Sequence, residues 1–564
     1  MLAVHLVLTG LPGVAAALLV ARRGVRSVPV LLALALAASA AVAMLAYWAY
    51  YEDRVIGESL SYFALIGSVA GIGWALYGGH LERGLLRQLA TPLALWMLGT
   101  TFLVFLGYLH GGTSEPLNAA GARFIPLPSD DAIPYFFGEF FFHHGHHLPP
   151  PIFPGEWLAS DRPPLQVGYM LSQRPFFWGN PELQYEVLGV GLQQLWIVGL
   201  WALLTAARVG RVTRALAVFA VLLSDVAIVN GFFVWPKMLP AALLLAVAAL
   251  VVTPLWTQLR RSFWAAALVA ALLGLAMMGH GSSVFGAIPL ALVAAYRGLP
   301  SWRWVGVALL VGFVVMAPWS AYQRYGDPPG NRLLKWQLAG VPEVDSRGFK
   351  ETLVDSYREA GFGGTLHNKG QNFITMAGGG PYADNVKATV EAIGDGDVRG
   401  AVEDVRNAFF FDLLPSLGLL LVVPFLMVAA RRRGRLRREE WGFALTCFAI
   451  FVIGAIAWGL LIFGDLPART VIHAGSFLLP VLAFAGLVAG LRAVFPRFAV
   501  YYVAVSSLLM LALYVPSYEP LPGSSFSFLA ALLAAAGLAG FVAVALRADE
   551  VPQEATLPAV PAAG

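Results

Sequence analysis

The sequence predicts an all-α polytopic membrane protein, on the evidence of its composition and its repeated long apolar runs. Of the 564 residues, 58% are hydrophobic and only 12% are charged, and the mean hydropathy is +0.71. Soluble domains carry about 25% charged residues, so this composition excludes an ordinary soluble globule. It also gives no basic stripe for nucleic acid, and we expect no nucleic-acid partner.

About fifteen apolar runs are long enough to be membrane helices, given that a span needs about 20 residues. They cover residues 2–21, 28–50, 60–79, 91–109, 186–206, 215–233, 238–254, 264–279, 283–296, 303–320, 409–430, 441–463, 472–490, 498–516 and 525–546. The first run lacks a basic leading region and continues directly into the second. It is therefore expected to be a membrane helix and not a signal peptide.

Arginines set the expected orientation, because they concentrate in every second loop. These loops contain Arg22, Arg23 and Arg26; Arg83 and Arg87; Arg208, Arg211 and Arg214; Arg260 and Arg261; Arg297 and Arg303; Arg431, Arg432, Arg433, Arg435, Arg437 and Arg438; and Arg492 and Arg497. Positive loops face the cytoplasm, so the amino terminus is expected outside and the carboxyl terminus inside. The excess of arginine over lysine is typical of a GC-rich bacterial genome, which predicts a multi-pass protein of the bacterial plasma membrane.

Four segments follow from this topology. Residues 1–90 form amino-terminal spans, 91–320 a transmembrane module with the long outer loop 111–185, 321–408 an outer loop or cap, and 409–564 the carboxyl-terminal spans and tail. Within loop 111–185, the apolar stretch 133–142 is expected to be a short helix in the membrane interface. Stretch 383–409 has the pattern of helix with glycine breaks. Both long outer loops offer space for chemistry at the outer membrane surface.

Acidic and basic residues flank that interfacial stretch. Asp130 and Asp131 precede it, and a partly desolvated carboxylate near basic groups can serve as a general base. Asp161 and Arg162 begin a rigid turn that leads into the next span, which fixes an acid and a permanent cation in place. The simpler interpretation of paired acids before an apolar run is a helix cap or a solvated edge.

At these residues the chain resembles the membrane-embedded glycosyltransferases of the GT-C fold, of the protein mannosyltransferase and aminoarabinose transferase type. Members carry an Asp-Glu pair in the first large outer loop, an apolar stretch ending near a glycine, and an Asp/His-x-Pro-Pro-Leu turn. Here Asp130 and Asp131, the run to Gly145, and the DRPPL turn at 161–165 follow that order. The resemblance covers roughly residues 91–320. Two departures leave the acceptor open: three extra spans precede the loop, and a histidine- and proline-rich insertion separates the motifs.

The resemblance implies transfer of a sugar, with inversion, from a polyprenyl-phosphate donor to a glycan, lipid or protein acceptor at the extracytoplasmic face. On this mapping Asp130 is the catalytic base, Asp131 stands where Glu is usual, and Asp161 belongs to the catalytic set. Cations must stabilise the departing lipid phosphate, and a groove must admit the lipid tail. Candidates for the phosphate are Arg162, Lys237, His280, Arg324, Arg332, Lys335, Arg469 and His473. Any one of them is also compatible with a headgroup anchor, and His280 with a capped turn.

The cluster HHGHH, with His143, His144, His146 and His147, raises the question of a metal. Imidazoles bind zinc well, but adjacent histidines rarely point at one ion and no standard metal spacing is present. We therefore expect no required cofactor and leave a divalent metal open. Within a predicted span, Asp225 and Asn230 are expected to face the protein interior.

Other functional classes stay in view. A polymerase or ligase of lipid-linked glycans would also place its chemistry on outer loops, depending on Arg and His more than on an aspartate pair. A transporter would place charges near the bilayer midplane and often shows internal repeats, whereas here ionisable groups gather at the expected outer edge. A pure scaffold would not need these charges.

Overall fold

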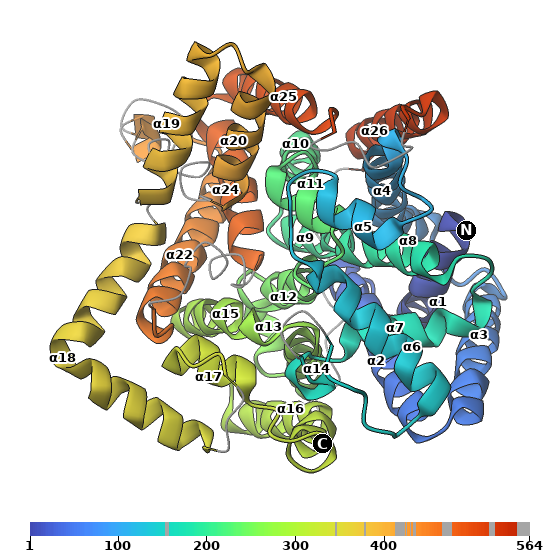
Figure 1. The fold of residues 1–564 in the computed structure, drawn as a ribbon. Coiled ribbons are helices and arrows are strands. Elements are labelled where there is room, and N and C mark those ends of the chain that lie inside the picture. Colours follow the sequence, from blue (N-terminus) through green and yellow to red (C-terminus); the bar gives the residue numbers. More distant parts are fainter. Residues whose placement is uncertain are drawn as a thin grey trace.

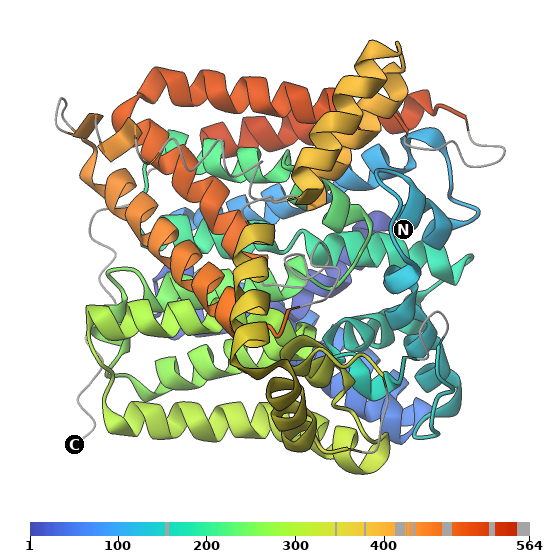
Figure 2. The same cartoon turned by 60° about the vertical axis from the view of Figure 1, so that its left-hand side comes forward.

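The computed structural model describes residues 1–152, 157–343, 347–376, 380–411, 424, 426–428, 430–431, 436–464, 477–517 and 525–549. Within these ranges the regular structure is helical, apart from one isolated bridge between Ile152 and Trp157. The chain is thus an all-α protein, and many of its long helices run side by side along a common direction, whereas α18 and α22 cross it (Figure 1 and Figure 2).

Helices occur where the sequence predicts apolar spans. The amino-terminal half contains α1 (Leu2–Arg22), α2 (Val28–Glu52), α3 (Arg54–Leu76), α4 (Arg83–Gly107), α5 (Pro116–Ala122), α6 (Ala132–His144), α7 (Leu165–Gln173), α8 (Pro181–Gln193), α9 (Trp196–Ala206), α10 (Arg211–Leu222), α11 (Asp225–Phe232) and α12 (Met238–Val251). There follow α13 (Trp256–Leu259), α14 (Phe263–Gly279), α15 (Val284–Arg297), α16 (Trp302–Ala321), α17 (Arg332–Ala339), α18 (Phe349–Met376), α19 (Gly380–Gly394), α20 (Val398–Phe411), α22 (Arg438–Leu461), α24 (Leu478–Val494), α25 (Pro496–Tyr514) and α26 (Phe528–Arg547).

Not all of these helices are long enough to cross a bilayer alone. Among the described residues nine candidates have the length and apolar composition of a span, or ten if α10 and α11 form one span bent by 55°. Shorter apolar helices occupy 238–251, 263–279, 281–297 and 478–494, where four further spans were expected. Most of the expected span 409–430 lies outside the described residues. The membrane character is therefore supported, while the count of fifteen stays a prediction.

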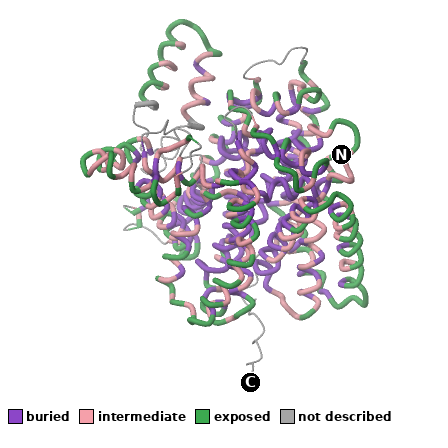
Figure 3. Tube along the Cα trace, turned by 60° about the horizontal axis from the view of Figure 1, so that its bottom comes forward, coloured by how far each residue is buried: buried purple, intermediate pink, exposed green. Residues whose placement is uncertain are grey.

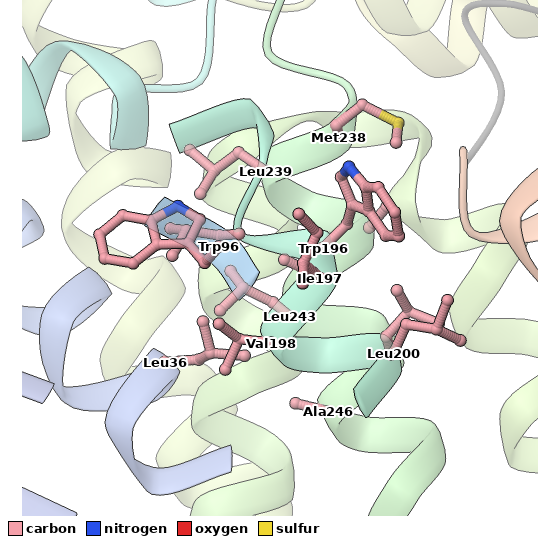
Figure 4. Close-up of a cluster of buried hydrophobic side chains, with 14 of the residues drawn as sticks. Leu36, Trp96, Trp196, Ile197, Val198, Leu200, Met238, Leu239, Leu243 and Ala246 are labelled. Carbon is pink, nitrogen blue, oxygen red and sulfur yellow. The ribbon is translucent and has the colours of Figure 1, made fainter. Parts of the chain in front are cut away.

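Helices α9 and α12 form the centre of the bundle. All eleven residues of α9 and all fourteen of α12 are buried, which explains why neither has a polar face. A Cβ at Gly199 would lie only 2.4 Å from the carbonyl oxygen of Ala242, so this glycine permits a very close helix contact. Figure 4 shows this packed region, with Ile197 near Leu243 and the ring of Trp196 near Met238.

Apolar side chains also cover the periphery. Phe63 on α3, Phe313 on α16 and Tyr501 on α25 are about 70% exposed. Figure 3 shows the buried residues in the middle of the bundle and exposed ones along its outer helices. Apolar surface on long outer helices is what a surrounding bilayer requires.

The arginine-rich loops, predicted to be cytoplasmic, meet at one end of the bundle. Arg26 lies 3.8 Å from Glu82, and Arg87 lies 3.7 Å from Asp549. Arg214 donates to the main-chain carbonyl of Asp549 at 2.6 Å, which brings a third arginine-rich loop to the same end. The loops therefore group as the alternation predicts; the assignment of this end to the cytoplasm stays a prediction.

The stretch 133–142 is helical, as expected, but most of it does not face the membrane interface. It forms α6, which packs on α7 and α2 and buries Ile133, Phe137 and Phe141. A Cβ at Gly138 would lie 2.5 Å from the sulfur of Met170, so α6 and α7 approach closely. Of its large apolar side chains, Phe136 is the exposed one. The apolar character thus reflects burial within the protein.

The second outer segment, 321–408, consists of helices spread along the side of the bundle away from α3 (Figure 1). Helix α18 bends at Gly361, where φ is +60°. The predicted glycine break separates α19 from α20, and α20 brings the buried Arg406 back to the bundle. Arg406 and Arg123 donate to the same carbonyl oxygen, that of Pro516, at 2.8 and 2.9 Å.

Candidate functional site

Asp130 and Arg162, the two residues that the sequence favours most, form an ion pair. Nη2 of Arg162 lies 3.1 Å from Oδ1 of Asp130, and both side chains are largely buried. Asp130 lies in the short turn Ser129–Asp131 before α6, and Arg162 follows the turn Ala159–Asp161 before α7. Because α6 and α7 pack together, the residues that precede them are brought into contact. The carboxylate of Asp130 is therefore balanced by a cation.

An aromatic platform holds Arg162 in place. Its guanidinium lies 4.0 Å from the centre of the Trp157 ring, and that of Arg332 lies 4.2 Å from the same ring. Trp336 stacks on Trp157 with 5.9 Å between the ring centres. Cation–π contacts of this kind orient a guanidinium without neutralising its charge. The second outer segment thus contributes to the site through α17, which carries Arg332 and Trp336.

Lys237 and His280 form a second group of nitrogens. Nζ of Lys237 lies 2.5 Å from Nε2 of His280 and 4.0 Å from the centre of the Trp235 ring. Burial, with the charge of Arg162 nearby, lowers the pKa of Lys237 well below its usual range. Burial, Lys237 and Arg162 likewise lower the pKa of His280. Both groups therefore belong to the electrostatic surroundings of the Asp130–Arg162 pair.

Asp131 occupies different surroundings from Asp130. Its side chain is buried, and Oδ2 has no hydrogen-bond partner. Burial, and to a lesser extent the charge of Asp130, raises the pKa of Asp131 to about 8. The hydroxyl of Tyr185 donates to the main-chain carbonyl of Asp131 at 2.8 Å, and Glu186 is close enough to interact electrostatically. Burial therefore favours the protonated form of Asp131 and makes it a poorer candidate for the base than Asp130.

Asp161 stabilises its own turn. Its Oδ2 accepts a hydrogen bond from the main-chain N–H of Leu158 at 3.1 Å. This contact fits the simpler interpretation of the residue as a cap, and not the catalytic one. Burial raises its pKa, although Arg332 and Arg162 oppose that shift. Asp161 therefore shapes the turn that presents Arg162.

The remaining cation candidates divide into three groups. Lys335 is buried and lies on α17 next to Trp336. Arg324 is exposed, and its guanidinium lies 5.6 Å from the centre of the exposed Tyr325 ring. Arg469 and His473 lie outside the described residues. Of the sequence candidates, the structure groups Arg162, Lys237, His280 and Arg332 with Asp130 and Asp161.

The HHGHH histidines lie at the far end of α6. His143 is 3.7 Å from Glu139, which also pairs with Arg174 at 2.6 Å, and His146 stacks on His147 at the surface. In the described part of the chain, no group of three or more His, Cys, Asp or Glu side chains is arranged to hold a metal ion. Asp225 and Asn230 are buried in α11, as predicted.

An apolar cavity of about 270 Å³ lies between α14 and α16. Leu273 and Met277 line it from α14, and Ala308 and Gly312 line it from α16. It reaches Ser283, in the turn that begins directly after His280.

Sequence reasoning missed the residues that connect the two outer segments, Trp157, Gln323 and Asp327. Asp327 accepts from the N–H of Ser160, and Gln323 donates to the carbonyl of the same residue, both at 2.9 Å. The one available signal was the polar string DPPGNR directly after a predicted span. Comparison with protein-family models, curated proteins and solved structures finds no match for this chain.

Proposed function

We propose that this chain is an inverting glycosyltransferase that moves a sugar from a polyprenyl-phosphate donor to an acceptor at the extracytoplasmic face of a bacterial plasma membrane. One observation carries the proposal: a carboxylate paired with an arginine lies among further nitrogens, and an apolar cavity reaches Ser283, three residues after His280. This arrangement combines a base, a phosphate-binding group and a place for a lipid tail, which are the parts that the reaction needs.

In the proposed reaction the donor phosphate binds Arg162, with Lys237 and His280 beside it. Because Arg162 then contacts phosphate, its hold on Asp130 weakens and the carboxylate becomes available as a base. Asp130 removes the proton from an acceptor hydroxyl as that oxygen bonds to the sugar C1 from the face opposite the phosphate. The bond between C1 and the phosphate oxygen breaks, and polyprenyl phosphate leaves with the bonding electrons. The sugar configuration is inverted.

The lipid tail of the donor would occupy the cavity between α14 and α16. Its lining is almost wholly apolar, and each buried CH2 group contributes about 0.8 kcal/mol. The exposed apolar faces of the outer helices support a position of this cavity within the hydrocarbon layer. A lipid donor therefore reaches the site from the membrane, while the acceptor, whether glycan, lipid or protein, arrives at the outer loops.

A polymerase or ligase of lipid-linked glycans is the second candidate. The observation that favours it is the Lys237–His280 contact next to Arg162, because that class is expected to use Arg and His more than an aspartate. In a transporter these groups would bind the lipid phosphate without breaking the bond at C1. Both alternatives predict that Asp130 is dispensable for chemistry.

The test is Asp130→Asn in purified protein with normal expression. Asparagine keeps the shape but cannot accept a proton, so transfer from polyprenyl-phosphate sugar should fall at least about 100-fold. Asp131→Asn, the matched neighbour, should lose far less because Asp131 is buried and protonated. Full turnover by Asp130→Asn together with its loss in His280→Ala would replace the transferase assignment by the polymerase or ligase.

A further inference from the structure

The end of α16 holds the turn that carries Arg162. After α16 the chain continues through a π-helical turn, Tyr322–Gly326, and reaches the buried Asp327. Oδ2 of Asp327 accepts the N–H of Ser160, and Nε2 of Gln323 donates to the carbonyl oxygen of Ser160, each at 2.9 Å. Both polar main-chain groups of one residue are thus bound by side chains from a segment more than 160 residues away.

The two hydrogen bonds with Asp327 and Gln323 affect the site through Ser160. It is fully buried, it precedes Asp161, and it lies two residues before Arg162. A turn of three residues, 159–161, leaves little freedom between the bound residue and the arginine. Fixing the main chain at Ser160 therefore fixes the position from which Arg162 reaches Asp130.

Further contacts fix the position of Gln323, which binds Ser160. The Gln323 amide also donates to the carbonyl of Gly330 at 2.8 Å, so its amide nitrogen has two acceptors. Gly330 has φ of +57°, and a Cβ there would lie 2.6 Å from the Cβ of Gln323, so only glycine lets the chain turn back this closely. A charge-assisted hydrogen bond from a buried main-chain N–H to a carboxylate contributes more than a neutral one.

We propose that Asp327 and Gln323 are positioning residues, which hold Ser160 and thereby set Arg162 against Asp130. The proposal rests on the proposed function for its kinetic part only. Neither residue contacts the Asp130–Arg162 pair directly, so neither is expected to take part in bond making or breaking. Their effect is on geometry, where a misplacement of about 1 Å can cost on the order of 100-fold in rate.

The first test measures hydrogen exchange at Ser160 and needs no turnover. The N–H of Ser160 donates to Asp327, so Asp327→Ala should speed its exchange by at least about tenfold, because that exchange requires the bond to open. Asp327→Asn keeps an acceptor oxygen and should preserve most of the protection. The control Asp395→Ala removes an exposed carboxylate between α19 and α20 and should change nothing. Equal exchange rates of the Ser160 N–H in wild type and Asp327→Ala would show that Asp327 does not fix Ser160, whatever reaction the protein catalyses.

The second test measures transfer kinetics in the same variants, with Gln323→Ala added. Asp327→Ala should raise the donor KM and lower kcat/KM by about 10- to 100-fold, with kcat/KM restored largely by Asp327→Asn. Gln323→Ala should follow in the same direction with a smaller loss. Faster exchange at Ser160 with unaltered kcat/KM would overturn the positioning role and leave the transferase standing. Absence of transfer in the wild type would instead refute the proposed function, and the exchange result would still decide whether Asp327 holds Ser160.

Discussion

Lys237 and His280 share a hydrogen bond whose direction is set by a main-chain amide. The N–H of Ser282 points at Nδ1 of His280 at 3.1 Å, so Nδ1 carries a lone pair and the ring proton of a neutral imidazole is on Nε2. Nε2 then donates to Nζ of Lys237, 2.5 Å away, which accepts only as an uncharged amine. The lowered pKa values of both groups agree with this protonation state. The ligand-free site thus holds Lys237 as a neutral amine.

Donor binding should accordingly take up a proton at Lys237. Phosphate favours the ammonium form and raises the lowered pKa, so donor affinity should increase as the pH is decreased. Lys237→Arg keeps a permanent charge and should bind the donor without this pH dependence. Calorimetry in buffers of different ionisation enthalpy measures the proton taken up, with Lys387→Arg on exposed α19 as the control. An identical proton uptake in wild type and Lys237→Arg would refute the statement that Lys237 is uncharged before the donor binds.

Arg162→Ala should weaken donor binding by about 10- to 100-fold, because a hydrogen bond to a charged group contributes about 1.5–3 kcal/mol. Arg162→Lys should recover part of the affinity but lose the planar contact with Trp157. Binding of a fluorescent polyprenyl-phosphate sugar in detergent measures both. Arg358→Ala, at an exposed arginine of α18, is the matched control. An unaltered donor affinity in Arg162→Ala would count against the phosphate role.

The apolar cavity can be filled from one of its walls. Gly312 lines it, whereas Gly306 lies on the same helix outside it, and a Cβ at either glycine has open space around it. Gly312→Phe should raise the KM for a long-chain donor several-fold and leave a short-chain donor unaffected, because only the long tail needs the volume. Gly306→Phe should behave as wild type. Equal effects of Gly312→Phe on the KM of both donors would show that the lipid tail does not bind in this cavity.

Because the pKa of Asp131 is raised, the free energy of unfolding should fall as the pH rises. In the fold it keeps its proton up to about pH 8, whereas an unfolded chain releases it at about pH 3.9. The native state therefore binds more protons between these values, and the free energy of unfolding decreases as the pH rises through that window. Asp131→Asn should flatten this slope and raise the melting temperature at pH 8 relative to wild type. Melting of both proteins at pH 5, 6.5 and 8 measures it, and parallel slopes would contradict the buried acid.

Long apolar runs predict the helices well, because a helix buried in protein and a helix in contact with lipid both need apolar side chains. The ends of α1 and α2 lie within two residues of the expected spans. The apolar stretch before HHGHH was misplaced for the same reason, since protein interior and membrane interface select similar side chains. In the sequence, a phenylalanine that packs inside the protein, as Phe141 does on Tyr47 and Tyr51 of α2, looks the same as one that faces lipid headgroups.

For the site, the sequence named Asp130 and Arg162 as candidates but did not predict their ion pair, which depends on the packing of α6 against α7. The separate roles of Asp130 and Asp131 could not be predicted, since neighbouring residues differ only in the direction that the turn gives them. Asp327 was unpredictable on other grounds. It acts across 167 residues through a main-chain N–H, a contact that no side-chain pattern in the sequence reports.

The convergence of Arg123 and Arg406 on the carbonyl of Pro516 bears on how the chain is assembled. Arg123 also binds the carbonyl oxygens of Tyr514 and Val515, which follow it by more than 390 residues. During synthesis this guanidinium reaches the membrane long before its acceptors at the end of α25 exist. The loop that carries Arg123 therefore gains these contacts only after α25 has been made. Residues 91–320 expressed alone would leave Arg123 with the carbonyl oxygens of Leu106 and Gly107 but without those of Tyr514, Val515 and Pro516.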